Sequence, residues 1–213
     1  MKPRVLGERG VPAEQLWRAQ GGEHFRLNDD VSVRVYPSLH SCIWSNNAPP
    51  GTVVTGDYGV FEDEREGRLA RSRAARAASG NGLRPEWAYS DSTGGALDYL
   101  IDTPDGTILF QDSMGYWTGI YAGLRADLAI LGASGRGNVD GEPFQGSTEQ
   151  FILRECELIR PRQVLSGHHD NYAGAAGLPD LTDLGPVHAE LARVMPRLEV
   201  LEVGLAGRIT VLG

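Results

Sequence analysis

The sequence predicts a layered α/β fold, and three observations support this prediction. Residues 127–166 have the pattern of a strand, a helix and a second strand; residues 96–112 have the pattern of a hairpin; and a second helix is expected near Pro186. Strands that alternate with helices pack as layers, with the helices against a sheet. Because 213 residues with 41% hydrophobic content can bury one core, we expect a single domain over residues 1–213.

The first strands lead directly into polar residues. "VSVRVYP" (31–37) alternates apolar and polar positions and is rich in β-branched residues, which predicts a half-buried strand that runs into "SLHS". "ALDYLIDTPDGTILFQD" (96–112) predicts two strands around Pro104-Asp105-Gly106, since proline presets φ and glycine accepts unusual conformations. This hairpin ends at Asp112.

The next predicted unit is a strand, a helix and a strand. "DLAILG" (127–132) is a continuous apolar run, which is typical of a strand buried on both faces. "STEQFILRECELIR" predicts a helix with Ser147 or Thr148 as N-cap, and Pro161 stops it. The strand "QVLS" (163–166) follows. The expected apolar face of the helix consists of Ile152, Cys156 and Ile159.

The end of the chain predicts one more helix. It begins near Pro186, a residue favoured in the first helical turn, with Val187, Leu191 and Val194 on one face. "LEVLEV" and "RITVL" are expected to follow as strands.

Residues 46–95 differ in composition from the rest of the chain. They open with Pro49-Pro50-Gly51 and contain the run "FEDEREGRLARSRAARAASG", which favours an inserted cap with a solvated helix. Arginines from a cap would favour a substrate with a phosphate or carboxylate group. Unchanged activity after deletion of residues 62–79 would contradict that role.

Charge, hydropathy and cysteine content exclude several classes of protein. The net charge is −8, with 28 acidic and 20 basic residues and no separate basic cluster, so nucleic acid is not an expected partner. No apolar run reaches the roughly 20 residues of a membrane helix, and the start lacks a signal peptide, which predicts a cytoplasmic protein with no membrane partner. Cys42 and Cys156 form no CxxC motif, which argues against a disulfide framework and a cysteine zinc site.

Three predicted strands end in residues that can bind metal. His40, Asp112 and His168 each follow an apolar run. Sites in open α/β sheets gather where strands end, and two imidazoles with one carboxylate form a partial zinc shell. His169 is adjacent to His168, so on extended backbone the two rings point in opposite directions.

Single residues of this kind usually have ordinary roles. A histidine or aspartate after a strand is more often a turn or cap residue than a ligand, so the coincidence of three strand ends supports the site more than any one residue does. His24 is assigned to a turn-like approach to a strand, and His188 to the first turn of the last helix.

The order of these runs resembles the metallo-β-lactamase superfamily, and most closely its lactonase-like branch. The runs are "GGEHFRLNDDVSVRVYPSLHS", "YLIDTPDGTILFQDS", "DLAILGASGRG" and "LIRPRQVLSGHHDNY", and the resemblance covers roughly residues 21–45 and 96–212. It implies an αββα sandwich with a metal site at one edge. It also implies that His40, Asp112 and His168 are metal ligands, with His169 as the alternative to His168.

The resemblance further implies a chemistry. A metal-bound water would attack an ester, lactone, amide or phosphodiester of a small-molecule substrate. Zinc is the expected ion, with manganese or iron as alternatives, because His/Asp shells discriminate poorly among these ions. No separate catalytic side chain is predicted.

The sequence departs from the family at its hallmark motif. The family carries HxHxDH upstream of the position of His40, whereas this chain has no HxH and its first histidine is His24. We therefore expect an N-terminally incomplete chain, in which the three ligands hold at most one ion weakly. An uncovered apolar sheet face would follow, with self-association into a homo-oligomer or marginal stability. A truncated or degenerate, non-catalytic member of the same fold is the alternative.

A serine hydrolase is a further alternative. "LAILGASGRG" places Ser134 after a strand, with Asp170 and His188 as later partners. The GxSxG motif, however, requires glycine where Arg136 stands, and no helix is expected directly after it. The same run also lacks the dinucleotide pattern GxGxxG.

Overall fold

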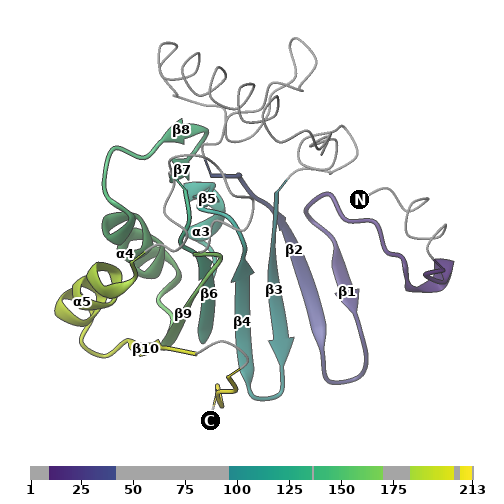
Figure 1. Cartoon of the computed structure of the whole chain (residues 1–213). Coiled ribbons are helices and arrows are strands. Elements are labelled where there is room, and N and C mark those ends of the chain that lie inside the picture. The colour runs from purple at the N-terminus through teal and green to yellow at the C-terminus, as the bar shows by residue number, and fades with distance from the viewer. Residues whose placement is uncertain (1–9, 42–95, 136, 170–182, 204–206, 213) are drawn as a thin grey trace, which may run out of the picture.

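The computed structural model describes residues 10–41, 96–135, 137–169, 183–203 and 207–212 (Figure 1). The cap predicted at 46–95 lies outside the described residues. The main strands are β1 (His24–Arg26), β2 (Ser32–Pro37), β3 (Leu97–Thr103), β4 (Gly106–Gln111), β6 (Leu128–Gly132), β9 (Gln163–Gly167) and β10 (Glu199–Leu201). Three short strands are β5 (Gly115–Tyr116), β7 (Asn138–Val139) and β8 (Glu142–Pro143). The helices are η1 (Ala13–Gln15), α3 (Thr118–Tyr121), α4 (Thr148–Ile159) and α5 (Gly185–Val194).

The main sheet is mixed and has seven strands in the order β1-β2-β3-β4-β6-β9-β10, and the short strands form a second sheet in the order β5-β7-β8. Helices α4 and α5 lie together beside the β6 and β9 side of the main sheet (Figure 1). This arrangement confirms the general α/β class. Of the helices in the described ranges, none is both long and apolar enough to cross a membrane.

Strand direction determines where the strand ends meet. The pairs β2–β3 and β3–β4 are antiparallel, so β2 runs in the same direction as β4. Strands β4, β6 and β9 pair in parallel. The carboxyl ends of β2, β4, β6 and β9 therefore lie at one edge of the sheet, which we call the C-terminal edge.

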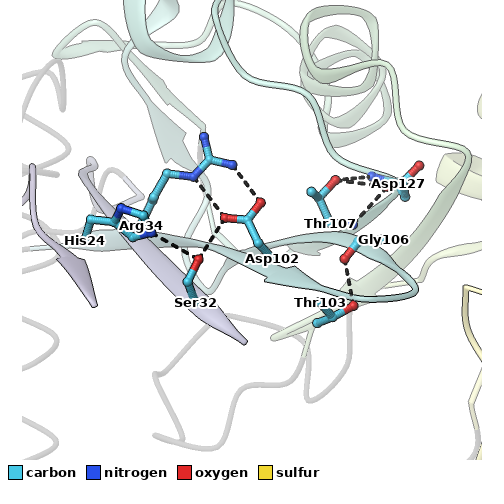
Figure 2. A network of polar contacts seen from close by, with 8 residues as sticks. All are labelled: His24, Ser32, Arg34, Asp102, Thr103, Gly106, Thr107 and Asp127. Atoms are coloured by element: carbon cyan, nitrogen blue, oxygen red, sulfur yellow. Dashed lines mark hydrogen bonds and ion pairs between the residues drawn. The ribbon is translucent and has the colours of Figure 1, made fainter. Parts of the chain in front are cut away.

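The β3–β4 hairpin forms as predicted. Its strands pair up to Thr103 and Gly106, and Gly106 has a φ of 146° that suits glycine. Thr107 donates from its backbone N–H to Asp127 Oδ2 at 2.9 Å, and its hydroxyl lies 3.1 Å from the same oxygen (Figure 2). These bonds attach the hairpin to the start of β6.

Helix α4 also forms as predicted. Ser147 is the N-cap and makes a capping box with Gln150, since the Ser147 side chain accepts from the Gln150 N–H and the Gln150 side chain accepts from the Ser147 N–H. The helix ends at Arg160, which has a left-handed φ of 57° just before Pro161. The three residues of the predicted apolar face, Ile152, Cys156 and Ile159, are all fully buried.

Two predictions for the C-terminal region were wrong. Val187 and Leu191 are buried as expected, but Val194, the last residue of α5, is 37% exposed. "RITVL" (208–212) is not a strand. At the end of this run Leu212 has a left-handed φ of 57°, and its N–H donates to the side chain of Gln163 and not to a neighbouring strand.

The core lies between one face of the sheet and the helices. Strand residues Leu100, Leu109 and Val164 pack in one cluster with residues of α4 and α5. In β6 the neighbouring residues Leu128 and Ala129 point to opposite faces and are both buried, which confirms the predicted doubly buried strand.

Candidate functional site

The C-terminal edge brings the three predicted ligands to the same part of the molecule. His40 follows β2 by three residues, Asp112 directly follows β4, and His168 directly follows β9. The charges of His168 and Asp112 both act on the pKa of His40, the first lowering it and the second raising it. The three side chains therefore lie within electrostatic reach of one another.

His168 is held by the backbone of Asp112, directly after β4. Its ring Nδ1 lies 2.6 Å from the carbonyl oxygen of Asp112, and its own φ is 40°. A carbonyl only accepts, so Nδ1 carries the proton of the neutral ring and Nε2 is the basic nitrogen. Metal-binding histidines have this second hydrogen bond, which fixes the ring and its tautomer.

His40 has a similar arrangement. Its Nδ1 lies 3.1 Å from the Ser41 carbonyl oxygen and 3.1 Å from the Ser41 hydroxyl. Burial has the largest effect on the pKa of His40 and lowers it; the hydrogen bond with the Ser41 backbone raises it by less, and the charges of His168 and Asp112 lower and raise it by still smaller amounts. The ring is therefore neutral near pH 7, which is the protonation state that binds a metal.

The loop that carries His40 is tied to the neighbouring loops. Ser41 N–H donates to Ser113 Oγ at 2.9 Å, and Asn138 Nδ2 donates to the His40 carbonyl at 3.0 Å. Since Ser113 directly follows Asp112, the first bond joins the ends of β2 and β4.

A close approach of two backbones strengthens this connection. Ser38 Oγ donates to the Gly115 carbonyl at 2.9 Å, and Gly115 lies against Leu39. A Cβ added at Gly115 would lie 2.7 Å from the Leu39 carbonyl carbon and 2.8 Å from Leu39 Cβ. Only glycine fits this contact without a shift of the loop.

Below the C-terminal edge lies a buried polar group that sequence reasoning missed. Gln111 Nε2 donates to Glu155 Oε1 at 2.5 Å, and Gln111 Oε1 accepts from Gly132 N–H at 3.3 Å. Glu155 is fully buried, and burial raises the pKa of its carboxyl well above the ordinary range, so it is protonated. Gln111 thereby joins the ends of β4 and β6 to α4. The helical spacing of Glu155 with Phe151 and Ile152 was the signal that could have identified it.

Asp98 is a second buried carboxyl that the sequence analysis did not identify. It is 1% exposed, and Tyr121 donates from its hydroxyl to Asp98 Oδ2 at 3.0 Å. Burial raises the pKa of Asp98 to about 7, against smaller downward effects of its hydrogen bonds with Ser38 and Tyr121. The alternation of β3 places Asp98 on the core face with Leu100, and this was the available signal.

The other histidines have separate roles. His24 lies in β1, where its Nε2 is 3.0 Å from Ser32 Oγ, so the turn-like assignment was wrong; the pairing of β1 with β2 makes this segment a strand. His188 lies in the first turn of α5 as expected, and its Nδ1 is 2.8 Å from Glu202 Oε1. Neither histidine follows a strand at the C-terminal edge.

His169 was predicted as the alternative to His168 as a metal ligand, and this stays a prediction. Its Nδ1 is buried, and within the described part of the chain no hydrogen-bond partner of this atom is found.

The serine hydrolase arrangement does not form around Ser134. Ser134 follows β6, but the next helix, α4, begins only at Thr148, so the strand–turn–helix elbow is missing. Asp170 lies outside the described residues, and His188 pairs with Glu202.

The side chains of His40, Asp112 and His168 are of types that bind metal ions, but in this structure they are not arranged around one point. Two neutral imidazoles and a carboxylate suit zinc, and in both rings Nδ1 lies against a backbone oxygen. Over residues 10–41, 96–135, 137–169, 183–203 and 207–212, however, no group of three or more His, Cys, Asp or Glu side chains is arranged to hold a metal ion. Comparison with protein-family models and with curated proteins found no match for this sequence.

Proposed function

We propose that this protein is a metal-dependent hydrolase that cleaves an ester, lactone or phosphodiester bond of a small molecule, with His40, Asp112 and His168 as metal ligands. The observation that supports this most is the common direction of β2, β4 and β9, which places all three donors at the C-terminal edge. The proposal includes an αββα sandwich of the metallo-β-lactamase type as the complete fold.

The residues of the chain would have distinct roles in this activity. A bound zinc ion, or manganese or iron in its place, would supply Lewis acidity and an activated water. The carbonyl oxygens of Ser41 and Asp112 orient the two imidazoles by accepting from Nδ1. Gln111, held by Glu155, fixes the strand end that carries Asp112.

A second candidate is a non-catalytic member of the same fold. It is favoured by one specific observation, that the given sequence contains no HxH and therefore not the HxHxDH motif of the family that it resembles. Such a protein would bind one ion weakly or none, and would not hydrolyse the bonds named above.

Zinc binding by matched double variants tests the proposal. We expect the wild-type chain to bind zinc and hydrolyse a generic lactone or phosphodiester. The zinc affinity of His40→Ala/His168→Ala should fall at least about 100-fold, because this variant lacks two side chains that bind the ion directly, whereas loss of a residue that only hydrogen-bonds to a ligand already costs 10- to 100-fold. His24→Ala/His188→Ala removes the same number of imidazoles away from the C-terminal edge and should bind as the wild type does. Titration calorimetry and elemental analysis provide the readouts.

Each outcome discriminates between the two candidates. Zinc binding that is equally strong in both double variants would place the ligands elsewhere and overturn the site assignment. Zinc binding through His40 and His168 without hydrolysis, or no binding at all in the wild type, would favour the non-catalytic candidate.

A further inference from the structure

Ser38 lies between two hydrogen-bond acceptors in the buried part of the molecule just before His40. Its Oγ donates to the Gly115 carbonyl at 2.9 Å, and it also makes a hydrogen bond with the carboxyl of Asp98. Both side chains are buried, so these contacts are shielded from bulk water. A serine hydroxyl has a single proton, so Ser38 can donate to only one of the two acceptors at a time.

The protonation state of Asp98 decides how the proton of Ser38 is used. A protonated carboxyl has an O–H group, so it can donate to Ser38 Oγ while Ser38 donates to Gly115. An ionised carboxylate only accepts, so its contact with Ser38 requires the serine proton. The Gly115 carbonyl then faces a lone pair of Ser38 Oγ, and one buried hydrogen bond is lost.

The surroundings of Asp98 make its ionisation costly. Burial raises the pKa of this carboxyl to about 7, and the hydrogen bonds with Ser38 and Tyr121 lower it by less. Tyr121 donates to Asp98 Oδ2 at 3.0 Å. Burial also raises the pKa of the Tyr121 hydroxyl well above its ordinary value, so Tyr121 donates whether or not Asp98 is charged.

The other groups near Asp98 keep their charge near neutral pH. Tyr36 lies opposite Asp98 in the β2–β3 pair. Glu155 of α4 is protonated, and a charge on Asp98 raises the pKa of its carboxyl further, so the two carboxyls do not ionise together. Arg34, on the same face of β2, donates to Asp102 at 2.8 Å. Asp98 is therefore the group of this cluster that changes its charge.

The bond from Ser38 to Gly115 joins the two loops that carry His40 and Asp112. Ser38 lies two residues before His40, and Gly115 lies three residues after Asp112. The Gly115 carbonyl also accepts from Gln111 Nε2 at 3.3 Å, but this bond comes from the end of β4 itself. The shorter bond, from Ser38, is the one that connects this carbonyl to the loop of His40.

We propose that Asp98 and Ser38 form a proton-controlled pair that positions His40 relative to Asp112. With Asp98 protonated, Ser38 donates to Gly115 and holds the loop of His40 against the loop after β4. With Asp98 ionised, Ser38 donates to Asp98 and this connection is lost. Both are positioning residues, since neither is one of the proposed metal ligands. The effect on zinc rests on the proposed function, whereas the change in the loop does not.

The pair changes zinc affinity in the direction opposite to that of the histidine ligands. Histidines bind zinc when they are neutral, so their deprotonation raises the affinity as the pH rises. Ionisation of Asp98 loosens the site as the pH rises through about 7, and this lowers the affinity. The loss of one hydrogen bond corresponds to about two- to tenfold. Asp98→Asn retains a donor to Ser38 at every pH, so it should not show this loss.

NMR of the metal-free protein tests the pair without reference to zinc. Between about pH 5.5 and about pH 9, the amides of Leu39 and Tyr116 should shift with the same midpoint, about 7, as the carboxyl carbon of Asp98. Tyr116 shares its peptide group with the Gly115 carbonyl. These shifts should be absent in Asp98→Asn. They should persist in Asp102→Asn, the matched control, which removes a carboxyl of the same strand whose ion pair is partly exposed.

Two results of the NMR experiment would overturn the proposal. One is a wild-type protein in which the carboxyl of Asp98 does not titrate in this range, or titrates without the amides of Leu39 and Tyr116. This result requires no variant, so it does not depend on the folding of one. The other is an Asp98→Asn variant in which the same amides shift as in the wild type.

Titration calorimetry with zinc tests the link to the metal site. Asp98→Asn should bind as the wild type does at about pH 6 and about two- to tenfold more tightly at about pH 8, while Asp102→Asn follows the wild type at both. In a Ser38→Ala background, Asp98→Asn should give no such gain, because the shared proton is absent.

The calorimetry separates this inference from the proposed function. A ratio of affinities between Asp98→Asn and the wild type that is the same at both pH values would overturn the link between the pair and His40. If the amide shifts occur as expected but none of these proteins binds zinc, the positioning pair stands and the proposed set of ligands is wrong.

Discussion

The Asp98→Asn variant is expected to be more stable than the wild-type protein at pH 8, by about 2–4 kcal/mol, and equally stable near pH 4. Burial raises the pKa of Asp98 from 3.8 to about 7 in the folded protein. Between these two values the folded state binds more protons than the unfolded state. The wild-type protein therefore loses stability as the pH rises from about 4 to about 7, by at most roughly 4 kcal/mol from this residue.

The contacts of Asp98 explain why an amide can replace its carboxyl. Tyr121 donates to one carboxyl oxygen at 3.0 Å, and an amide oxygen accepts this bond equally well. Ser38 Oγ already donates to Gly115, so it can accept from the NH₂ group of an asparagine. The change therefore removes the cost of ionisation and keeps the hydrogen bonds. Glu155, whose carboxyl also has a raised pKa and is repelled by the charge of Asp98, adds to the loss of stability in the same direction.

Urea unfolding of both proteins at several pH values measures this effect. Asp102→Asn serves as control, because Asp102 lies in the same strand but its carboxylate forms an ion pair with Arg34 at the surface. Loss of this ion pair should slightly lower the stability at pH 8. A difference between wild type and Asp98→Asn that stays constant from pH 4 to 8 would show that Asp98 does not titrate in this window.

The Gly115→Ala variant is expected to lose about 1–3 kcal/mol or more of stability and to bind zinc more weakly. The new methyl group would lie 2.7 Å from the Leu39 carbonyl carbon and 2.8 Å from Leu39 Cβ. Backbone atoms cannot move away as a side chain can, so the loop must shift or the packing must become strained. A shift of Leu39 changes the position of His40, the next residue, relative to Asp112.

Gly119→Ala is the matched control for this change. Gly119 lies in α3, where an added Cβ meets nothing within 4 Å, and alanine favours the helix. Its stability should be unchanged or slightly raised, and its zinc affinity should equal that of the wild type. Unfolding curves and calorimetry of the two variants measure both quantities. If Gly115→Ala had the same stability and the same zinc affinity as Gly119→Ala, the close approach of Gly115 to Leu39 would contribute to neither quantity.

The sequence was sufficient to predict the elements whose signals are local. The Pro104-Asp105-Gly106 turn predicted the β3–β4 hairpin, and Ser147 with the spacing of Ile152, Cys156 and Ile159 predicted α4. These signals depend on backbone preferences and helical periodicity within a few residues. The strand ends at Asp112 and His168 followed from the same local patterns.

Features that depend on distant partners were not predicted. "RITVL" was predicted as a strand, but a strand forms only where a neighbouring strand accepts its hydrogen bonds, and Leu212 instead donates to a side chain. Gln111 and Glu155 are 44 residues apart and meet only because α4 packs on β4 and β6. The site was therefore predicted as a set of strand ends, without the buried carboxyls beneath it.

The order of strands in the sheet also has a consequence for folding. Strands β3, β4, β6 and β9 are consecutive partners within residues 97–167, whereas β2 pairs with β3 through Pro37 and Leu97, about 60 positions apart in the chain. Contacts between distant segments require closure of a long loop in the unfolded chain, which slows their formation. We therefore expect β3, β4, β6 and β9 to assemble first and β2 to join them late. His40 then reaches the C-terminal edge only in the last stage of folding.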